Sequence, residues 1–425
     1  MSDPIEKIEL FHLDIPLPEP FFPSWIPGYP QTANRSTLLR IESKNGLVGM
    51  SAGPAFERER EGLGDLLGPY LLGTDVNDVA RATDLIRQAG FLGWHNAFLE
   101  GAFWDAKAKG EGLPVYKLLN REAATCNELK VYCSTGSLKT PEDRIKDLDA
   151  ILAAGFGGIK LRVHSFDEKE DERLMRQVRD ALDDDVQLMV DANQGWLVSI
   201  LDPAPKWDLE RAKRFCKVAE ECNLSWVEEP LDRHDYDGLS ELRACTKVPI
   251  AGAELNAGWH EFKILLEREC FDIYQPDCTL AGGMSDCARL AKAATAKGKK
   301  FTPHTWTNGI GFLMNMHLKA AFPSDLLLEF PHEPPGWVAE HRDALLREPI
   351  KVKANGTVSV PQEPGLGIDL DEKCLRRYGS RLYVGSPMRI AMHTLKNNGI
   401  KNAFDLRKRK KAADEKHALA DKTAI

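Results

Sequence analysis

Several features that mark specialised classes of protein are missing from this sequence. No stretch approaches the run of about 18 apolar residues that a membrane helix needs, so we expect no membrane partner. The N-terminus reads MSDP and has neither the basic start nor the apolar core of a signal peptide. The nine cysteines are dispersed without a Cys-x-x-Cys pair, which favours reduced thiols over a disulfide framework or a zinc site. These absences predict a cytoplasmic protein.

An excess of positive charge is missing too. The formal net charge is −8, so a nucleic-acid partner has no overall electrostatic support. One basic block lies at 407–411, in a polar tail that begins near Ser386. It fits either an anion-binding patch or a solvated helical extension or oligomer contact. We favour the extension or contact, because Asp414, Glu415 and Asp421 follow closely. Homo-oligomeric assembly is a further expectation.

The chain has 425 residues, of which 43% are hydrophobic and 28% charged, enough for one large domain and a smaller one. Residues 1–128 are predicted to form an α+β unit with a hairpin and two helices. The strands of the hairpin are expected at 38–42 and 47–50 with a turn at 44–46, and the helices at 79–89 and 96–109. A Gly-Leu-Pro break at 112–114 is expected to end the second helix.

From residue 129 the pattern changes to short β-rich runs, each followed by an amphipathic helical stretch. The runs lie at 130–134, 158–163, 187–193, 225–230, 248–254, 272–277, 300–306 and 326–330. Strand then helix, repeated eight times, is the signature of an α/β fold of the (β/α)₈ barrel type, predicted here over 129–330. Residues 331–385 are expected to return to 1–128 and complete a capping domain, which leaves 386–425 as a tail.

Ionisable residues stand at the ends of these predicted strands. Because the C-terminal strand ends of a (β/α)₈ barrel line the active site, their identities indicate the chemistry. Lys160 and Arg162 alternate onto one face of the second strand. Asp191, Glu228 and Glu254 end three consecutive strands. Neighbouring carboxylates repel one another unless a cation joins them, and hard oxygen ligands suit Mg²⁺.

A possible acid/base pair follows on the next two strands. Asp277 ends the sixth strand and His304 stands near the end of the seventh, where a carboxylate can fix the imidazole tautomer and raise its basicity. A proton next to a carboxylate is very weakly acidic, since its removal gives a dianionic enediolate. A divalent metal and a lysine stabilise that charge as it develops, and a base of suitable pKa takes the proton. Glu329 ends the eighth strand.

These strand ends carry recognisable short motifs in a fixed order. They are EGAFWD at 100–105, GLPVY at 112–116, GIKLR at 158–162, DAN at 191–193, WVEEP at 226–230, GAE at 252–254, PD at 276–277 with GG at 282–283, PH at 303–304 and LE at 328–329. Each is weak alone. In this order, over about residues 5–385, they resemble the mandelate racemase/muconate lactonizing enzyme-like members of the enolase superfamily, and among these the mandelate racemase branch, of which acid-sugar dehydratases are a large share.

The resemblance implies a role for each of these residues and a Mg²⁺ cofactor. Asp191, Glu228 and Glu254 would be the metal ligands. Lys160 would bind or polarise the substrate carboxylate, and Glu329 would hydrogen-bond its other oxygen. His304 with Asp277 would be the acid/base dyad.

In this family, loops of the capping domain select the substrate. They correspond here to residues 20–30 and about 50–57. Trp25 and Tyr29 lie in the first of them, where they fit substrate contact and packing of the cap equally well.

Arg162 departs from the commonest family pattern, in which a second lysine acts as a base on the face opposite the histidine. Arginine stays protonated in nearly all settings, so it is a poor base. A racemase needs a base on each face of the substrate. A dehydratase needs only one residue, if His304 takes the α-proton and then protonates the departing β-hydroxyl. We therefore favour dehydration of a sugar acid to a 2-keto-3-deoxy acid.

Other polar residues near the strand ends are weaker candidates. His164, Asn193 and Trp306 are possible substrate contacts, although a loop position is the simpler interpretation of His164. For Glu229 a supporting position behind the metal ligands is preferred. Two other functions stay open, an epimerase, racemase or cycloisomerase acting on a carboxylic acid, and a non-catalytic binding protein that works through the basic tail.

Overall fold

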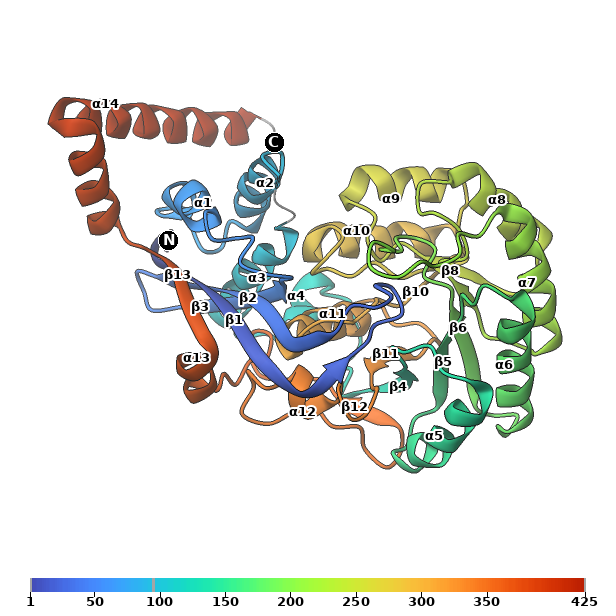
Figure 1. The fold of residues 1–425 in the computed structure, drawn as a ribbon. Coiled ribbons are helices and arrows are strands. Elements are labelled where there is room, and N and C mark those ends of the chain that lie inside the picture. The colour runs from blue at the N-terminus through green and yellow to red at the C-terminus, as the bar shows by residue number, and fades with distance from the viewer. Residues whose placement is uncertain (1, 94–95, 424–425) are drawn as a thin grey trace.

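The computed structural model describes residues 2–93 and 96–423, which form a sheet-and-helix unit beside a barrel (Figure 1). The first unit, called the cap below, is built on an antiparallel sheet in the order β13-β1-β2-β3. Its strands are β1 (Ile5–Phe21), β2 (Gln31–Ser43), β3 (Val48–Pro54) and β13 (Gly379–Gly385). The predicted hairpin is confirmed by the pairing of β2 with β3, and its turn contains Gly46 in the left-handed region (φ 86°).

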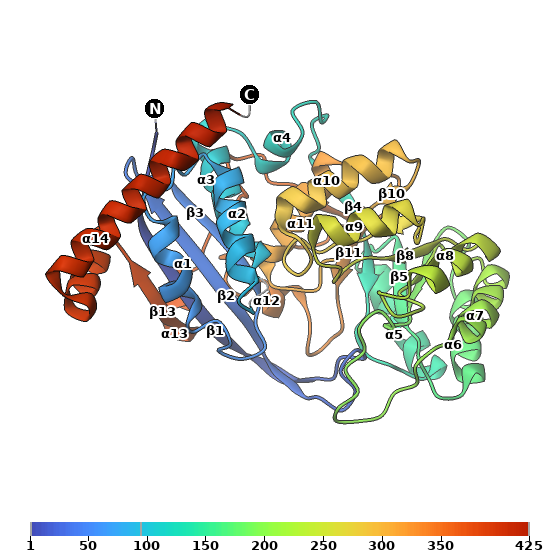
Figure 2. The same cartoon turned by 90° about the horizontal axis from the view of Figure 1, so that it is seen from above.

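Helices cover one face of this sheet (Figure 2). They are α1 (Leu63–Leu71), α2 (Val79–Gly90), a 3₁₀ turn at Ala97–Leu99 and α3 (Glu100–Glu111). The short helix α4 (Val115–Leu119) follows and packs against the barrel helix α11 (Gly309–Ala321), where the amide of Tyr116 donates to His317 Nδ1 at 3.2 Å. The two predicted helices correspond to α2 and α3. Gly49 of β3 allows α3 to approach closely, because a Cβ there would lie 1.9 Å from the carbonyl oxygen of Ala102. Gly112, in the left-handed conformation, ends α3 at the predicted break.

Eight parallel strands, one in each predicted run, form the barrel in the order β10-β9-β8-β7-β6-β5-β4-β11. They are β4 (Glu128–Ser134), β5 (Gly158–Arg162), β6 (Gln187–Asp191), β7 (Val227–Glu228), β8 (Ile250–Gly252), β9 (Ile273–Tyr274), β10 (Lys300–Phe301) and β11 (Leu328–Pro331). The barrel helices are α5 (Pro141–Ala153), α6 (Glu168–Asp180), α7 (Leu209–Glu221), α8 (Tyr236–Cys245), α9 (Gly258–Glu267), α10 (Gly283–Ala296) and α11 (Gly309–Ala321). Thr302 Oγ1 donates to the carbonyl oxygen of Leu327 at 3.0 Å and joins the β10 and β11 sides.

Most of these strands are shorter than predicted, and they are shortened mainly at their carboxyl ends. The run at 300–306, for example, contains β10 only at Lys300–Phe301. Beyond Phe301 the backbone forms hydrogen bonds with ionisable side chains at the strand ends. The amide of Thr305, for example, donates to Glu329 Oε2 at 2.7 Å.

The lower part of the barrel is filled by large side chains that support this edge. Tyr132, Met189, Trp226, Ala251, Ile273 and Leu327 form a separate buried cluster. Trp226 continues upward to the site, because its Nε1 donates to Glu228 Oε2 at 3.2 Å. A packed interior of this kind is a core and not a pore, so the polar groups above it rest on a rigid floor.

The C-terminal segments differ from expectation in one respect. Residues 331–385 were expected to pack on the cap, but β12 (Thr357–Ser359) pairs antiparallel with the barrel strand β4. The return to the cap is made by β13, which pairs with β1. Two short helices, α12 (Ala339–Arg342) and α13 (Glu372–Tyr378), lie along the way. β1 contains prolines at 16, 18 and 20. Proline is uncommon inside strands, so the sequence pattern does not predict the second half of β1.

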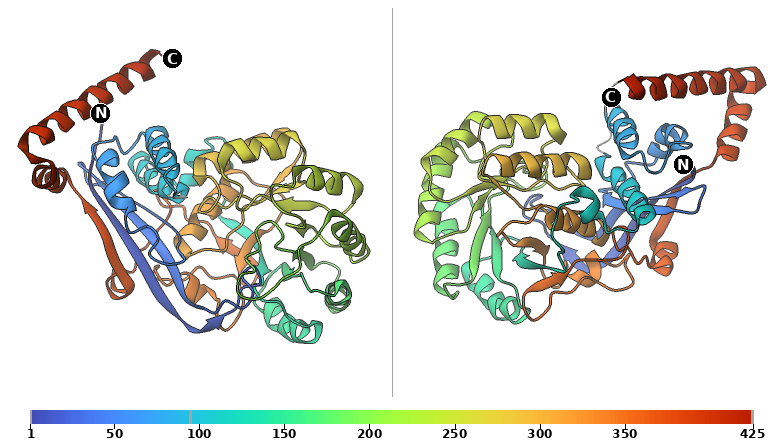
Figure 3. Two further views of the ribbon diagram at one scale, coloured as in Figure 1. Left: turned by 45° about the horizontal axis from the view of Figure 1, so that its top comes forward. Right: turned by 180° about the vertical axis from the view of Figure 1, so that it is seen from behind.

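The tail is the helical segment α14 (Pro387–Thr423), broken at Gly399 (φ 72°, ψ 166°). It lies on the outer side of the cap, away from the barrel (Figures 1 and 3). Its basic residues 407, 408, 409 and 411 are exposed, as a solvated extension requires. In the described part of the chain, no helix combines the length and apolarity that crossing a membrane requires.

Removal of residues 386–425 is expected to leave the protein folded and its activity unchanged, and at most to alter its assembly, because α14 lies away from the barrel. The measurements are thermal unfolding and enzyme assay of the truncated chain beside the full one. A truncated protein that stays folded and of unchanged oligomeric size but is inactive would contradict this expectation.

Candidate active site

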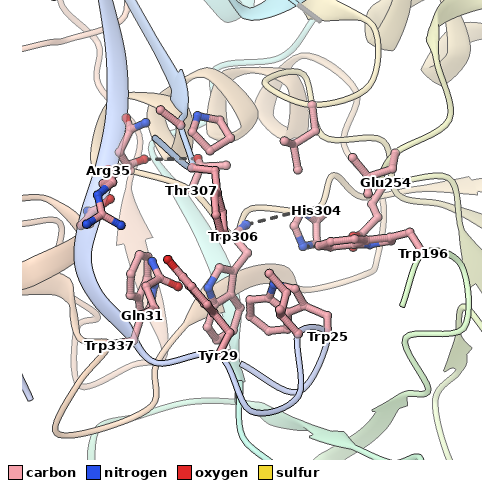
Figure 4. Close-up of a pocket in the computed structure, with 18 of the residues that line it drawn as sticks. Trp25, Tyr29, Gln31, Arg35, Trp196, Glu254, His304, Trp306, Thr307 and Trp337 are labelled. Atoms are coloured by element: carbon pink, nitrogen blue, oxygen red, sulfur yellow. Dashed lines mark hydrogen bonds and ion pairs between the residues drawn. The ribbon is translucent and has the colours of Figure 1, made fainter. Parts of the chain in front are cut away.

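A cavity of about 330 Å³ lies between the carboxyl edge of the barrel and the cap (Figure 4). This volume is within the range of about 300–1,000 Å³ that is usual for small-molecule sites. Both units contribute to its wall. The barrel supplies Arg162, Asn193, Trp196, Glu254, His304 and Trp306, and the cap supplies Trp25, Tyr29, Gln31, Arg35, Phe56 and Arg60. A substrate held here is therefore enclosed by chain segments far apart in sequence.

The three carboxylates predicted as metal ligands meet at the floor of the site. Strand register sets Arg162 beside Asp191, and Asp191 beside Glu228. Glu254 follows β8 after Ala253, whose backbone is left-handed (φ 90°). One oxygen from each carboxylate lies within 4.8 Å of the others, and all three side chains are buried. Burial raises the pKa of Glu228 to about 7, although a nearby lysine opposes the shift, and burial also raises the pKa of Glu254.

The charge of the surrounding cluster favours a bound cation. Its buried carboxyl groups are Asp191, Glu228, Glu229, Glu254, Asp277 and Glu329, and its buried basic groups are Lys160, Arg162 and His304. The carboxyl groups outnumber the basic groups. Burial of an uncompensated anion costs roughly several kcal/mol, so a bound cation would stabilise this cluster. Three convergent hard oxygen donors fit Mg²⁺, which would be held by Asp191, Glu228 and Glu254.

Lys160 links two sides of this cluster. Its Nζ lies 2.8 Å from Glu228 Oε1 and 2.8 Å from Glu329 Oε1. Burial opposes the charge, but Glu228 and then Glu329 raise the pKa of Lys160, while Lys160 outweighs burial and lowers the pKa of Glu329. Glu329 also accepts from Ser134 Oγ at 2.6 Å and from the amide of Thr305 at 2.7 Å. Glu329 is thus an acceptor here, whereas hydrogen bonding to a substrate carboxylate would require a proton on it.

Arg162 is a fixed cation. It forms an ion pair with Asp191, and its Nε donates to the carbonyl oxygen of Thr135 at 2.6 Å. The guanidinium carbon lies 5.1 Å from the ring centre of Trp25 and 5.2 Å from that of Trp306. Burial opposes the charge, but Asp191 outweighs it and raises the pKa of Arg162. Arg162 therefore binds anions and does not accept a proton.

The predicted acid/base pair lies on the other side of the carboxylates. His304 Nδ1 is 3.0 Å from Asp277 Oδ2, and His304 Nε2 is 3.1 Å from Glu254 Oε2. Asp277 is oriented by Thr279, whose amide and hydroxyl both donate at 2.8 Å, and by Asn315 Nδ2 at 2.8 Å. The Nδ1–H of His304 thus donates to Asp277, which leaves Nε2 as the nitrogen that can take up or release a proton at the cavity.

Backbone strain is concentrated at three successive strand ends. Asn193, Glu229 and Ala253 have positive φ values of 48°, 46° and 90°, after β6, β7 and β8. Such conformations cost about 1–3 kcal/mol each and persist where the surrounding structure holds them. The amide of Asn193 donates to Asp191 Oδ1 at 2.8 Å, so the turn orients a metal-ligand candidate. Glu229 is buried outside the three-carboxylate group, and burial raises its pKa well above the usual value.

Four of the five suggested substrate contacts line the cavity, namely Trp25, Tyr29, Asn193 and Trp306. His164 does not. It is buried two residues beyond β5, and burial lowers its pKa. Contact with substrate stays a prediction for the other four. Both predicted cap segments reach the cavity, 20–30 as a loop and 50–57 only at its end, because residues 50–54 belong to β3.

Several cavity residues were missed from the sequence, among them Gln31, Arg35, Arg60, Trp196 and Trp337. Positions 31, 33 and 35 alternate along β2 and so lie on one face of that strand. Because β2 follows the predicted loop at 20–30 directly, this alternation could have indicated these residues as further cavity residues. Trp196 donates from Nε1 to Glu254. No local pattern marks it or Trp337, because their positions depend on how the loops fold over the barrel.

Comparison with known families agrees with this arrangement. Residues 143–374 match the enolase C-terminal domain-like family, and residues 28–120 match the mandelate racemase / muconate lactonizing enzyme N-terminal domain. The chain belongs to the mandelate racemase / muconate lactonizing enzyme family of the enolase superfamily, as its motifs predicted.

Individual relatives are acid-sugar enzymes. The chain is 31% identical over 393 residues to L-talarate/galactarate dehydratase of Salmonella typhimurium, covering 88% of this chain and 91% of the relative. It is 30% identical to D-galactarolactone cycloisomerase of Agrobacterium fabrum, covering 80% and 90%. L-talarate dehydratase of Polaromonas, solved with Mg and L-glucarate, superposes with a TM-score of 0.73 at 28% identity, covering 90% and 99%. These enzymes are what the chain is similar to.

Replacing Asp191, Glu228 or Glu254 with alanine is expected to abolish Mg²⁺ binding. In the wild type, Mg²⁺ at one hundred times its Kd stabilises the fold by about 2.7 kcal/mol, and this stabilisation should vanish in each variant. The measurement is thermal unfolding with and without Mg²⁺, together with activity. Glu267→Ala, which removes an exposed acid on α9, serves as the control. Full activity in excess chelator would disprove the assignment.

The pKa of His304 is expected to fall when Mg²⁺ is added. Burial opposes a charge on the ring, but Glu254 first, then Glu329 and Asp277, raise the pKa of His304 to about 10. A cation held by Glu254 removes the largest of these raising influences. The ring can be followed by NMR titration with and without Mg²⁺, and His304→Asn identifies its signal. A pKa that does not move would show that the cation binds elsewhere.

Proposed function

We propose that this protein catalyses the Mg²⁺-dependent dehydration of a sugar acid to a 2-keto-3-deoxy acid. The observation that carries the proposal is the asymmetry of the site. His304 with Asp277 stands on one side of the three carboxylates, and the permanent cation Arg162 stands on the other. A single residue that can exchange protons suits an elimination in which one group serves as base and then as acid.

The substrate carboxylate binds at the floor of the cavity, next to Lys160 and Arg162. Both cations are buried and held by carboxylates, so their charge is in place before the substrate arrives. Asp191, Glu228 and Glu254 would hold Mg²⁺, which would supply further positive charge beside the substrate and stabilise the negative charge that develops there. Glu329 positions Lys160 and does not donate to the substrate.

The proton transfers then follow from the orientation of His304. Nε2 takes the α-proton, while Nδ1 keeps its proton and donates it in a hydrogen bond to Asp277, whose negative charge stabilises the imidazolium. The same Nε2 returns its proton to the β-hydroxyl, the β-carbon–oxygen bond breaks, and water leaves. The resulting enol tautomerises to the 2-keto acid. Both transfers occur on one face of the substrate, so elimination is syn.

A racemase is disfavoured, because Arg162 occupies the side where a second base would act. A cycloisomerase is the second candidate. One of the relatives is a cycloisomerase at 30% identity, and such a reaction also needs only one proton-exchanging group. Product analysis by mass spectrometry separates the two functions, because dehydration gives a 2-keto acid that lacks one water relative to its substrate, whereas a cycloisomerase product keeps the mass of its substrate. The experiment is a screen of sugar acids and their lactones with Mg²⁺.

Cytoplasmic location and homo-oligomeric assembly belong to the same proposal. They agree with a small-molecule enzyme of this family, and fractionation of the native source and size-exclusion chromatography test them. A non-catalytic binding role through the tail would instead predict no exchange of any α-proton with solvent. The intact set of ionisable groups at the strand ends argues against that role.

His304→Asn is expected to lose α-proton exchange and dehydration together, by about 10²-fold or more, since general acid–base catalysis contributes that much. Exchange is measured by NMR in deuterated solvent and dehydration by 2-keto acid formation. Asparagine keeps a polar side chain but cannot exchange a proton in this range. If the variant still exchanges the α-proton, another base exists, and the epimerase alternative regains support.

A further inference from the structure

The cap side of the cavity carries positive charge that the proposed reaction does not use. Figure 4 shows Arg35 of β2 on the opposite side of the cavity from His304 and Glu254. Gln31 and Trp337 lie on the same side as Arg35. Arg60 also lines the cavity. A substrate whose reacting carboxylate lies on the barrel floor must extend its carbon chain towards these groups.

Arg35 has capacity to bind a ligand. Its Nε lies 3.1 Å from Asp14 Oδ1 and its Nη1 lies 3.7 Å from Glu57 Oε1. The side chains of Asp14 and Glu57 are 53% and 65% exposed, and ion pairs with such solvated partners are weak. A guanidinium carries five N–H donors on three nitrogens, so these contacts leave donors of Arg35 for a group inside the cavity.

Arg60 adds a charge that is held in place. Its Nη1 donates to the carbonyl oxygen of Pro54 at 2.7 Å and pairs with Glu59 at 2.9 Å. Its guanidinium carbon lies 5.1 Å from the ring centre of Phe98. Burial lowers the pKa of Arg60, so an anion in the cavity would offset a desolvated charge.

Three further groups of the wall are hydrogen-bond donors. The indole nitrogens of Trp306 and Trp337 and the amide nitrogen of Asn308 are buried and have no hydrogen-bond partner among the described residues. The side-chain oxygen of Asn308 accepts from the amides of Ile310 and Gly311 at 3.0 Å each, which fixes the orientation of its amide. All three residues line the cavity, so its wall presents donors to a ligand rich in acceptors.

We propose that the substrate carries a second carboxylate at the far end of its chain, bound by Arg35 with Arg60 behind it. The site is then built for a dicarboxylic sugar acid. A monoacid ends there in a hydroxymethyl group, which is neutral and offers one oxygen to a cationic wall of donors. A carboxylate offers two oxygens and a charge. This inference rests on the proposed function, because it identifies the class of sugar acid used.

The test uses pairs of sugar acids that share all stereocentres and differ only at the last carbon, carboxylate in one and hydroxymethyl in the other. With Mg²⁺ present, kcat/KM of the wild type should be about tenfold or more higher for the diacid, as expected of a charge-assisted contact. Arg35→Gln should lose this preference mainly through a higher KM for the diacid, so that its kcat/KM falls towards that for the monoacid. Arg35→Lys should recover part of it.

Arg58→Gln is the matched control, since Arg58 belongs to the same region of the cap, is half exposed and does not line the cavity. It should behave as the wild type. A wild type that turns over diacid and monoacid equally, or an Arg35→Gln variant that loses both equally, overturns the inference.

Binding separates this inference from the proposed function. Mg²⁺-dependent thermal shifts are recorded with each pair for the wild type and Arg35→Gln. If diacids shift the wild type more than their partners, and Arg35→Gln removes the difference, the second carboxylate site stands even when no 2-keto acid forms. The proposed function alone then fails. If no diacid binds better than its partner, the second carboxylate site is disproved.

Discussion

The concentration of buried charge at the carboxyl edge of the barrel is the constraint on which the rest of the structure depends. Six buried carboxyl groups surround two basic side chains and one imidazole. In water these groups would be screened, whereas in the barrel each must be compensated by a partner fixed within a few ångströms. The packed floor around Trp226, the strained strand ends and the supporting hydrogen bonds to Asp277 and Glu329 all serve to hold that arrangement.

The same charge cluster explains why the site needs the cap. Electrostatic interactions are strong only where water is excluded, and the barrel edge alone would leave them open to solvent. The cap covers the edge with aromatic rings, and Trp25 joins Trp306 around the guanidinium of Arg162. The barrel supplies the ionisable groups of the reaction. The cap excludes water from them and forms the part of the cavity wall that faces the rest of the substrate.

The sequence was most informative where a residue's role follows from its position on a strand. Arg162, Asp191 and Glu228 end regular parallel strands, so register alone brings them together. Glu254, Asp277 and His304 lie a few residues beyond short strands, yet they reach the same site because the barrel directs all eight strand ends to one edge. The β-strand pattern was less reliable in β1, whose prolines conceal it, and in β12, which pairs with the barrel and not with the cap.

The sequence by itself therefore determined the barrel, the family and the ionisable groups, because these follow from a repeating pattern and from fixed strand-end positions. Only the tertiary structure decided which cap residues face those groups. Arg35 and Arg60 stand 100 residues or more before Lys160, the first of the barrel groups, and no periodicity connects them. Their meeting depends on how the cap loops fold over the barrel, a long-range packing outcome that local sequence does not encode.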